Sequence, residues 1–208
     1  MRPPLRPGCN ERTLMGKTRE KAAGPPSRVF DKTIVCRIDR CLGCRNCEIA
    51  CAVAHSQSQN IRGAVTESPR PRARVKVERA GTHGLPIQCR HCENAPCITV
   101  CPTEAMHRAS EGSPVTIDEQ RCIGCKLCMV VCPFGVIETS ADGKAVVKCD
   151  LCGRRVEAGQ LPACVAACLT HALQFVDIGE HSRRKRKAAA ERIQVEDSTW
   201  RAEAEAGT

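Results

Sequence analysis

The chain of 208 residues is long enough for one ordinary domain or two small ones, and only 2% of it is aromatic. Because aromatic side chains supply much of the apolar surface buried in a core, a purely organic core would be small. The formal net charge is +9, and no stretch reaches the roughly 18 apolar residues of a membrane span. Eighteen cysteines, sixteen of them between Cys41 and Cys168, indicate instead that groups bound to sulfur supply part of the interior.

Residues 1–32 are expected to form a basic arm that is flexible or docks on a partner. They contain eight basic and three acidic residues and no apolar segment of the kind found in signal peptides. This composition predicts a cytoplasmic protein. In that reducing compartment, dense cysteine indicates metal binding rather than disulfides.

The core predicted for residues 33–178 contains a fourfold cysteine repeat. Each group opens with C-x2-C and closes with C-x3-C, and only the gap between the second and third cysteine varies. Group one is Cys41, Cys44, Cys47 and Cys51; group two is Cys89, Cys92, Cys97 and Cys101; group three is Cys122, Cys125, Cys128 and Cys132; group four is Cys149, Cys152, Cys164 and Cys168.

Short strands and helices are expected around the groups, so the predicted fold class is α+β. The expected strands are Thr33–Ile38, Val115–Asp118, Val136–Thr139, Ala145–Lys148 and Leu173–Ile178. The turn Asp142-Gly143 predicts a hairpin between the third and fourth of them. Each closing C-x3-C is expected at the start of a short helix. Residues 57–86 are interpreted as an insertion that forms a surface hairpin around Val75 and Val77.

The spacing of groups one and three, C-x2-C-x2-C-x3-C, is the bacterial ferredoxin pattern for [4Fe–4S] clusters. Three cysteines two residues apart let a tight loop wrap one corner of a cubane, with Gly43 and Gly124 where the backbone must come close. The fourth cysteine is expected to have entered the helix and to face a neighbouring cluster. Group four alone could pass as a structural zinc site, but three cysteines at this tight spacing are not a zinc pattern.

At these residues the chain resembles the poly-ferredoxin subunits with four [4Fe–4S] clusters that serve molybdenum and tungsten oxidoreductases, hydrogenases and carbon monoxide dehydrogenases. The segments Cys41–Ser56 and Gln88–Cys97 most resemble the iron–sulfur subunit of carbon monoxide dehydrogenase. Similar subunits accompany tungsten aldehyde oxidoreductases and formate dehydrogenases. The resemblance covers Thr33 to Ile178 and leaves both tails outside.

The fold of that family implies two interleaved bacterial-ferredoxin-like units with extended tails. The inner unit would span about 87–148, and the outer unit would combine about 33–56 with 149–178. Each cluster would take three cysteines of one group and the last cysteine of its partner group. The implied sets are cluster A, Cys41, Cys44, Cys47 and Cys168; cluster B, Cys149, Cys152, Cys164 and Cys51; cluster C, Cys89, Cys92, Cys97 and Cys132; cluster D, Cys122, Cys125, Cys128 and Cys101.

The chain departs from the family pattern in one place. Proline follows Cys101 and Cys132, whereas Ala52 and Leu169 follow the closing cysteines of groups one and four. Proline has no backbone N–H, so these two residues restore a donor that could bond a cluster sulfur and shift its potential. Simple tolerance of substitution is the alternative.

Residues other than the sixteen grouped cysteines carry weaker signals. Cys36 alternates with apolar residues and is predicted to be a buried strand thiol, and Cys9 in the arm is expected to have no role. The six histidines share no spacing, although His91 beside a ligand cysteine is a candidate for tuning a cluster. Arg154 and Arg155 are interpreted as a solvated face rather than an anion site.

Residues 179–208 are expected to form a basic tail with helix-forming composition. The run Arg183–Lys187 is entirely basic, and the apolar stripe of Ile193 and Trp200 is too sparse for an isolated helix. A disordered tail and docking on a partner are the two alternatives.

The predicted function is that of an electron-transfer subunit, and not an enzyme on its own, because no nucleophile–base pair, phosphate loop or dinucleotide fingerprint is found. It would relay single electrons through four [4Fe–4S] clusters between a catalytic oxidoreductase subunit and a second redox subunit or carrier. Self-association into a longer chain of clusters is a further option.

The alternatives are a zinc protein whose basic tails bind nucleic acid, and a self-contained enzyme with a catalytic cluster. Four clusters of about −2 each would lower the net charge to about +1. This removes the argument for nucleic acid, and aromatic residues for base stacking are also scarce.

Overall fold

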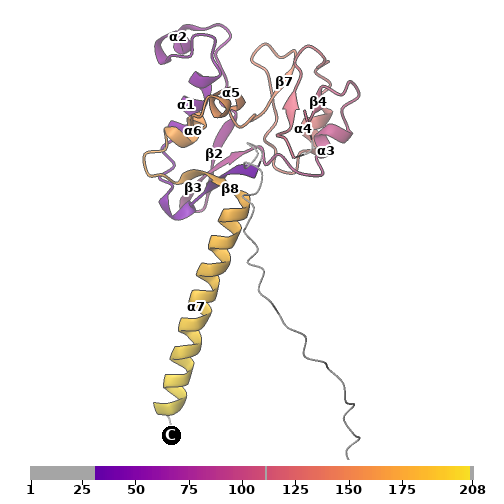
Figure 1. Cartoon of the computed structure of the whole chain (residues 1–208). Helices are drawn as coiled ribbons and strands as arrows, with labels where there is room; N and C mark the ends of the chain where they lie inside the picture. Colours follow the sequence, from indigo (N-terminus) through magenta and orange to yellow (C-terminus); the bar gives the residue numbers. More distant parts are fainter. Residues whose placement is uncertain (1–30, 111, 207–208) are drawn as a thin grey trace, which may run out of the picture.

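The computed structural model describes residues 31–110 and 112–206. In it, short strands and helices form a body from which one long C-terminal helix projects (Figure 1). The predicted basic arm, with Cys9, lies outside the described residues except for Asp31 and Lys32.

Every sheet in the described part of the chain is a two-stranded antiparallel pair. The pair β1–β8 joins the two ends of the body, with Ile34 opposite Phe175, and accounts for the strands predicted at residues 33–38 and 173–178. The pairs are β1 (Lys32–Cys36) with β8 (Leu173–Asp177), β2 (Val75–Ala80) with β3 (His83–Gln88), β4 (Met106–His107) with β5 (Thr116–Ile117), and β6 (Glu138–Thr139) with β7 (Val146–Val147).

The helices of the body are short, and four of them begin at or just before the third cysteine of a group. They are η2 (Ile38–Arg40), α1 (Asn46–Ala54), α2 (Ile61–Thr66), α3 (Pro96–Thr99), α4 (Leu127–Val131), α5 (Gly153–Glu157) and α6 (Ala163–Ala166). The prediction that C-x3-C lies at a helix start is therefore confirmed for the third cysteine of each group.

The prediction that the fourth cysteine has also entered the helix is right only for Cys51, which lies inside α1. Cys132 follows α4 directly, and Cys101 and Cys168 each lie two residues after their helix. Pro102 and Pro133 give a physical reason for two of these ends, because a residue before proline is disfavoured in the helical conformation. Ala52 imposes no such limit, and α1 continues for three residues past its cysteine, whereas α6 ends before Cys168 although Leu169 follows that cysteine.

The buried residues form two separate clusters, and cysteine sulfur contributes to both. The first lies between β1, β8, α1 and the β2–β3 hairpin, and the second lies between α3, α4 and the β4–β5 and β6–β7 pairs. The first comprises Ile34, Cys47, Cys51, Val75, Val77, Cys149, Leu151, Cys164, Val165 and Leu173. The second comprises Ala95, Met106, Val115, Cys128, Ile137 and Val146. Both clusters are small, as the scarcity of aromatic residues predicts.

The insertion at residues 57–86 is more than the surface hairpin that was expected. Its hairpin β2–β3 buries Val75 and Val77 in the first cluster, with exposed fractions of 2% and 6%. It also contains the helix α2, which the sequence analysis missed. The side chain of Asn60 caps this helix by accepting a hydrogen bond from Gly63 N at 2.9 Å.

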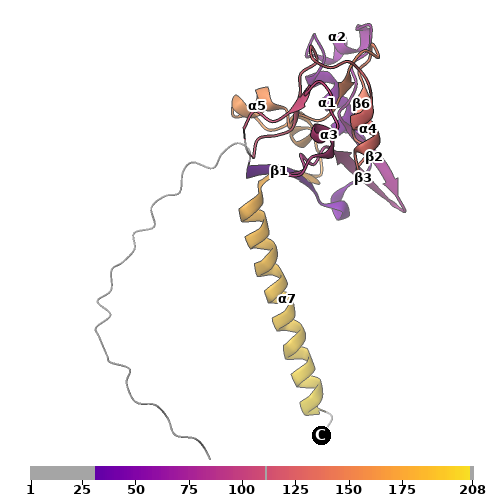
Figure 2. The ribbon, with the colours of Figure 1, turned by 90° about the vertical axis from the view of Figure 1, so that its right-hand side faces the viewer.

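The C-terminal stretch is the helix α7 (Ile178–Ala206), in line with its helix-forming composition and not with the alternative of a disordered tail. Two views at right angles show α7 pointing away from the body (Figures 1 and 2). The Asp177 carboxylate accepts a hydrogen bond from Glu180 N at 2.8 Å and caps the first turn. None of the helices described up to residue 206 is both long and apolar enough to cross a lipid bilayer.

Candidate iron–sulfur centres

One small cavity collects the first three cysteines of group three and the last cysteine of group two. It is lined by Cys101, Cys122, Cys125 and Cys128, with apolar walls that include Met106, Ile117 and Val146. Burial alone would raise the pKa of Cys101, but hydrogen bonds from the backbone of residues 103, 105 and 106 outweigh burial and lower it. These donors stabilise a thiolate at this position.

A second cavity shows the complementary arrangement. Cys89, Cys92, Cys97 and Cys132 line it, together with apolar residues such as Val115 and Ile137. It therefore joins three cysteines of group two to the last cysteine of group three. Burial raises the pKa of the Cys97 thiol, and the positive charge of Lys148 partly opposes this.

Cys51, the last cysteine of group one, lies among the cysteines of group four. Cys51, Cys149, Cys152 and Cys164 are all buried. Burial, together with the neighbouring thiols of Cys51 and Cys152, raises the pKa of Cys164 to about 12. Burial and the thiols of Cys51 and Cys164 also raise the pKa of Cys149 well above its usual value.

Cys168, the last cysteine of group four, lies near group one. Burial, followed by the nearby thiols of Cys41 and Cys168, raises the pKa of Cys36 to about 11. Cys36 is therefore a neighbour of both cysteines, and it is half-buried rather than buried as predicted. The Cys168 sulfur accepts a hydrogen bond from Leu173 N at 3.4 Å.

The residues around the four cysteine sets fit bound metal clusters, because they offer cysteine sulfurs as ligands and polar side chains beside them. Buried thiols with raised pKa values become stable thiolates when cations bind them, which is the usual form of a cysteine ligand. Among the described residues, the buried side-chain polar atoms without a hydrogen-bond partner are Gln88 Oε1 and both ring nitrogens of His91. Both residues adjoin cysteines of group two, so these orphaned atoms lie next to a proposed ligand set.

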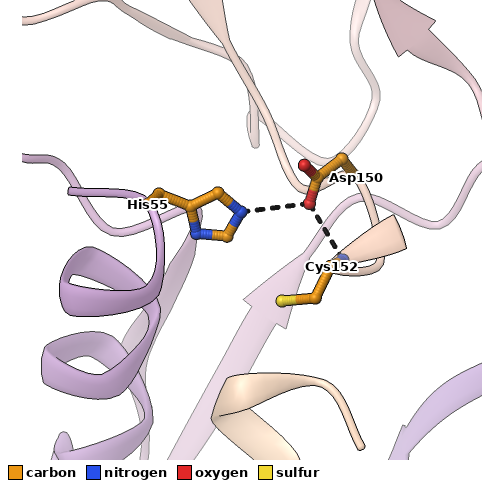
Figure 3. A group of neighbouring side chains, drawn as sticks. All are labelled: His55, Asp150 and Cys152. Carbon is orange, nitrogen blue, oxygen red and sulfur yellow. Dashed lines mark hydrogen bonds and ion pairs between the residues drawn. The ribbon is translucent and has the colours of Figure 1, made fainter. Parts of the chain in front are cut away.

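A network that the sequence analysis missed surrounds Cys51. Figure 3 shows His55 at the end of α1 facing Asp150, with Nε2 3.1 Å from the carboxylate Oδ1, and Cys152 N donating to the same oxygen at 2.9 Å. The guanidinium of Arg74 donates to the other oxygen at 2.7 Å. Burial would lower the pKa of His55, but its hydrogen bonds to Asp150 and Cys51 raise it to about 9.

A cavity of about 820 Å³ lies beside this network. Its lining includes His55, Arg74, Asp150, Arg154 and Arg155. Arg154 is exposed, and Arg155 Nε donates to the Leu161 carbonyl at 3.0 Å.

Known proteins resemble this chain over its cysteine-rich body. A 4Fe-4S dicluster domain matches residues 82–178. An iron–sulfur protein of Rhodospirillum rubrum is 44% identical over 167 residues, which are 74% of this chain and 87% of the relative. The chain belongs to the family of iron–sulfur electron-transport proteins with a 4Fe-4S dicluster domain.

Two further relatives of this dicluster protein have names that describe electron transfer. The putative electron transport protein YsaA of Escherichia coli is 40% identical and aligns over 75% of this chain and 96% of its own length. The thiosulfate reductase electron transfer subunit PhsB of Salmonella typhi is also 40% identical, over 68% of this chain and 73% of the relative. These matches support iron–sulfur chemistry over the zinc alternative, and they leave the link to carbon monoxide dehydrogenase a prediction.

Proposed function

We propose that this dicluster protein is the electron-transfer subunit of an oxidoreductase complex and that its sixteen grouped cysteines hold four [4Fe–4S] clusters. The composition of the two inner cavities carries the proposal, because each is lined by three cysteines of one group and the last cysteine of the other. The proposed sets are site A, Cys41, Cys44, Cys47 and Cys168; site B, Cys149, Cys152, Cys164 and Cys51; site C, Cys89, Cys92, Cys97 and Cys132; site D, Cys122, Cys125, Cys128 and Cys101.

A [4Fe–4S] cluster accepts and donates one electron at a time, which is the chemistry that bound clusters would supply. The chain itself provides the ligands and controls their access to solvent. All four cysteines of site B are buried, whereas Cys44 of site A and Cys125 of site D are exposed. Exposed aliphatic residues, Leu42 and Ile123, accompany these two cysteines. This contrast supports sites A and D as the ends of the conductor that redox partners approach.

We propose a catalytic oxidoreductase subunit as one partner and a second redox subunit or carrier as the other. The PhsB relative is by name an electron transfer subunit of a thiosulfate reductase, which supports a catalytic partner of the reductase class. A carbon monoxide dehydrogenase, a tungsten or molybdenum enzyme and a hydrogenase are the candidates that the sequence resemblance suggests. The division into inner and outer units and a cytoplasmic location belong to the same proposal.

Metal analysis of protein purified without oxygen tests this function. We expect about sixteen iron and about sixteen acid-labile sulfides per chain, because sixteen cysteines at four per cubane fill four sites. A brown colour with broad visible absorbance should accompany them. Stoichiometric zinc without iron would contradict the proposal, and about twelve iron with one zinc would remove group four from it.

A further inference from the structure

We propose that His55 is a positioning residue that hydrogen-bonds the Cys51 sulfur and raises the reduction potential of site B. The inference rests on the proposed assignment of Cys51 to the ligand set of group four. It assigns a role to a histidine whose spacing carries no recognisable motif.

The position of the His55 ring shows which atoms donate. Nδ1 lies 2.8 Å from the Cys51 carbonyl oxygen and 3.7 Å from the Cys51 sulfur, and Nε2 lies 3.1 Å from Asp150 Oδ1. A carbonyl and a carboxylate can only accept, so both ring nitrogens donate. The Nδ1–H is shared between the carbonyl oxygen and the sulfur. The backbone N–H of Arg74 donates to the same sulfur at 3.2 Å.

Asp150 fixes the orientation of the ring. One of its oxygens accepts from His55 and from Cys152 N, and the other accepts from the Arg74 guanidinium. This carboxylate therefore ties the end of α1 to the group-four loop and to the residue before β2. The histidine side chain is only 13% exposed, so water competes little for these hydrogen bonds.

A single metal ion is the competing interpretation of this cluster. A ring nitrogen of His55, an oxygen of Asp150 and the Cys152 sulfur lie within 4.8 Å of one another. Such an ion would have to compete with Arg74 and with the backbone donor for the carboxylate. It would also take Cys152 away from group four. The hydrogen bonds satisfy the same histidine and carboxylate atoms without displacing Arg74 and without removing Cys152 from group four.

Cys132 provides an internal reference, because it closes group three as Cys51 closes group one. Within the described residues no donor reaches the Cys132 sulfur, and Pro133 after it has no N–H. A hydrogen bond to a ligand sulfur stabilises the more negative, reduced state of a cluster and so raises its potential. Site B has such donors at Cys51, the ligand that its partner group contributes. Site C has none at the corresponding Cys132.

Two substitutions at one position test the role, with potentials followed by redox titration and electron paramagnetic resonance. The amide nitrogen of His55→Asn can occupy the place of Nδ1 and keep the contact to Cys51. The longer His55→Gln can reach Asp150 but loses the sulfur contact. The control is His83→Ala, which changes an exposed histidine on β3.

We expect His55→Gln to move one reduction step to lower potential, and His55→Asn and His83→Ala to leave every step in place, with equal iron contents. The inference is overturned if neither His55 variant shifts a potential, if both variants shift it equally, or if both lose iron equally. None of these outcomes depends on the donor to the Cys51 sulfur, which only His55→Asn keeps. Absence of all iron–sulfur signals from the unchanged protein would instead refute the proposed function.

Discussion

The backbone of Gly124 lies directly against the carbonyl oxygen of Lys144. A Cβ atom built on Gly124 would stand 2.4 Å from that oxygen, and the glycine has a φ of +66°. The cysteine loop of group three is therefore pressed against the loop of the β6–β7 hairpin. The approach of Gly124 to a cluster stays a prediction, and the neighbour that the structure shows is this hairpin.

Gly124→Ala should consequently damage site D. The left-handed conformation costs a residue with a side chain about 1–2 kcal/mol, and the collision with Lys144 adds to this. We expect a loss of about four iron per chain, the content of one cubane. Gly143→Ala is the matched control, because Gly143 has a φ of +76° and nothing within 4 Å of its added Cβ. Equal iron content in both variants would show that the backbone contact is unimportant.

Double substitutions test which cluster is bound by Cys51, the last cysteine of group one. Replacing Cys51 or Cys164 alone should remove about four iron. Replacing both should remove no more than about four, because they are proposed to share site B. Replacing Cys51 together with Cys44 should remove about eight, because these two are proposed to serve different sites. If instead the pair Cys51 and Cys44 removes only about four, the two share one cluster.

Removing the metal should destabilise the fold. Four of the ten buried residues in the first core cluster are cysteines. Few aromatic residues are present to fill the interior if the clusters bound to these cysteines are removed. We expect chelation under reducing conditions to lower the midpoint of thermal unfolding and to broaden the transition in circular dichroism. Reconstitution with iron and sulfide should restore both. An unchanged midpoint in the metal-free chain would show that the organic core suffices.

The helix α7 is predicted to bind a partner through its basic run, Arg183–Lys187. It projects from the body, and these side chains are exposed. Deleting residues 183–208 should leave the iron content unchanged and weaken co-purification with the catalytic partner. Deleting residues 188–208 retains the basic run and serves as the control. If both truncated chains bind the partner as tightly as the full chain, the helix has no docking role.

Local patterns allowed much of this architecture to be predicted from the sequence. The cysteine spacing located the helix starts, and the Asp142-Gly143 turn located the β6–β7 hairpin. The helix end at Cys132 was predicted wrongly, because the fourth cysteine was expected inside the helix although Pro133 follows it. Helix α2 was missed because Gly63 lies in its middle and weakens the helical signal, although Asn60 is a good cap.

Contacts between segments far apart in the chain could not be predicted from local sequence patterns, as the two partners of His55 show. His55 lies four residues after Cys51, so their contact follows from helical spacing alone. Asp150, its other partner, is 95 residues away in the chain and is brought close only by the fold. The proximity of Cys168 to Cys41 likewise depends on the pairing of β1 with β8.

The crossed ligand sets are the central claim, and a crystal structure of the protein purified without oxygen tests them most directly. We predict four cubanes, each bound by three sulfurs of one group and one sulfur of its partner group. In particular, Cys51 should ligate the cubane of Cys149, Cys152 and Cys164. Four cubanes each held by a single contiguous group, with Cys51 on the cubane of Cys44, would contradict the account.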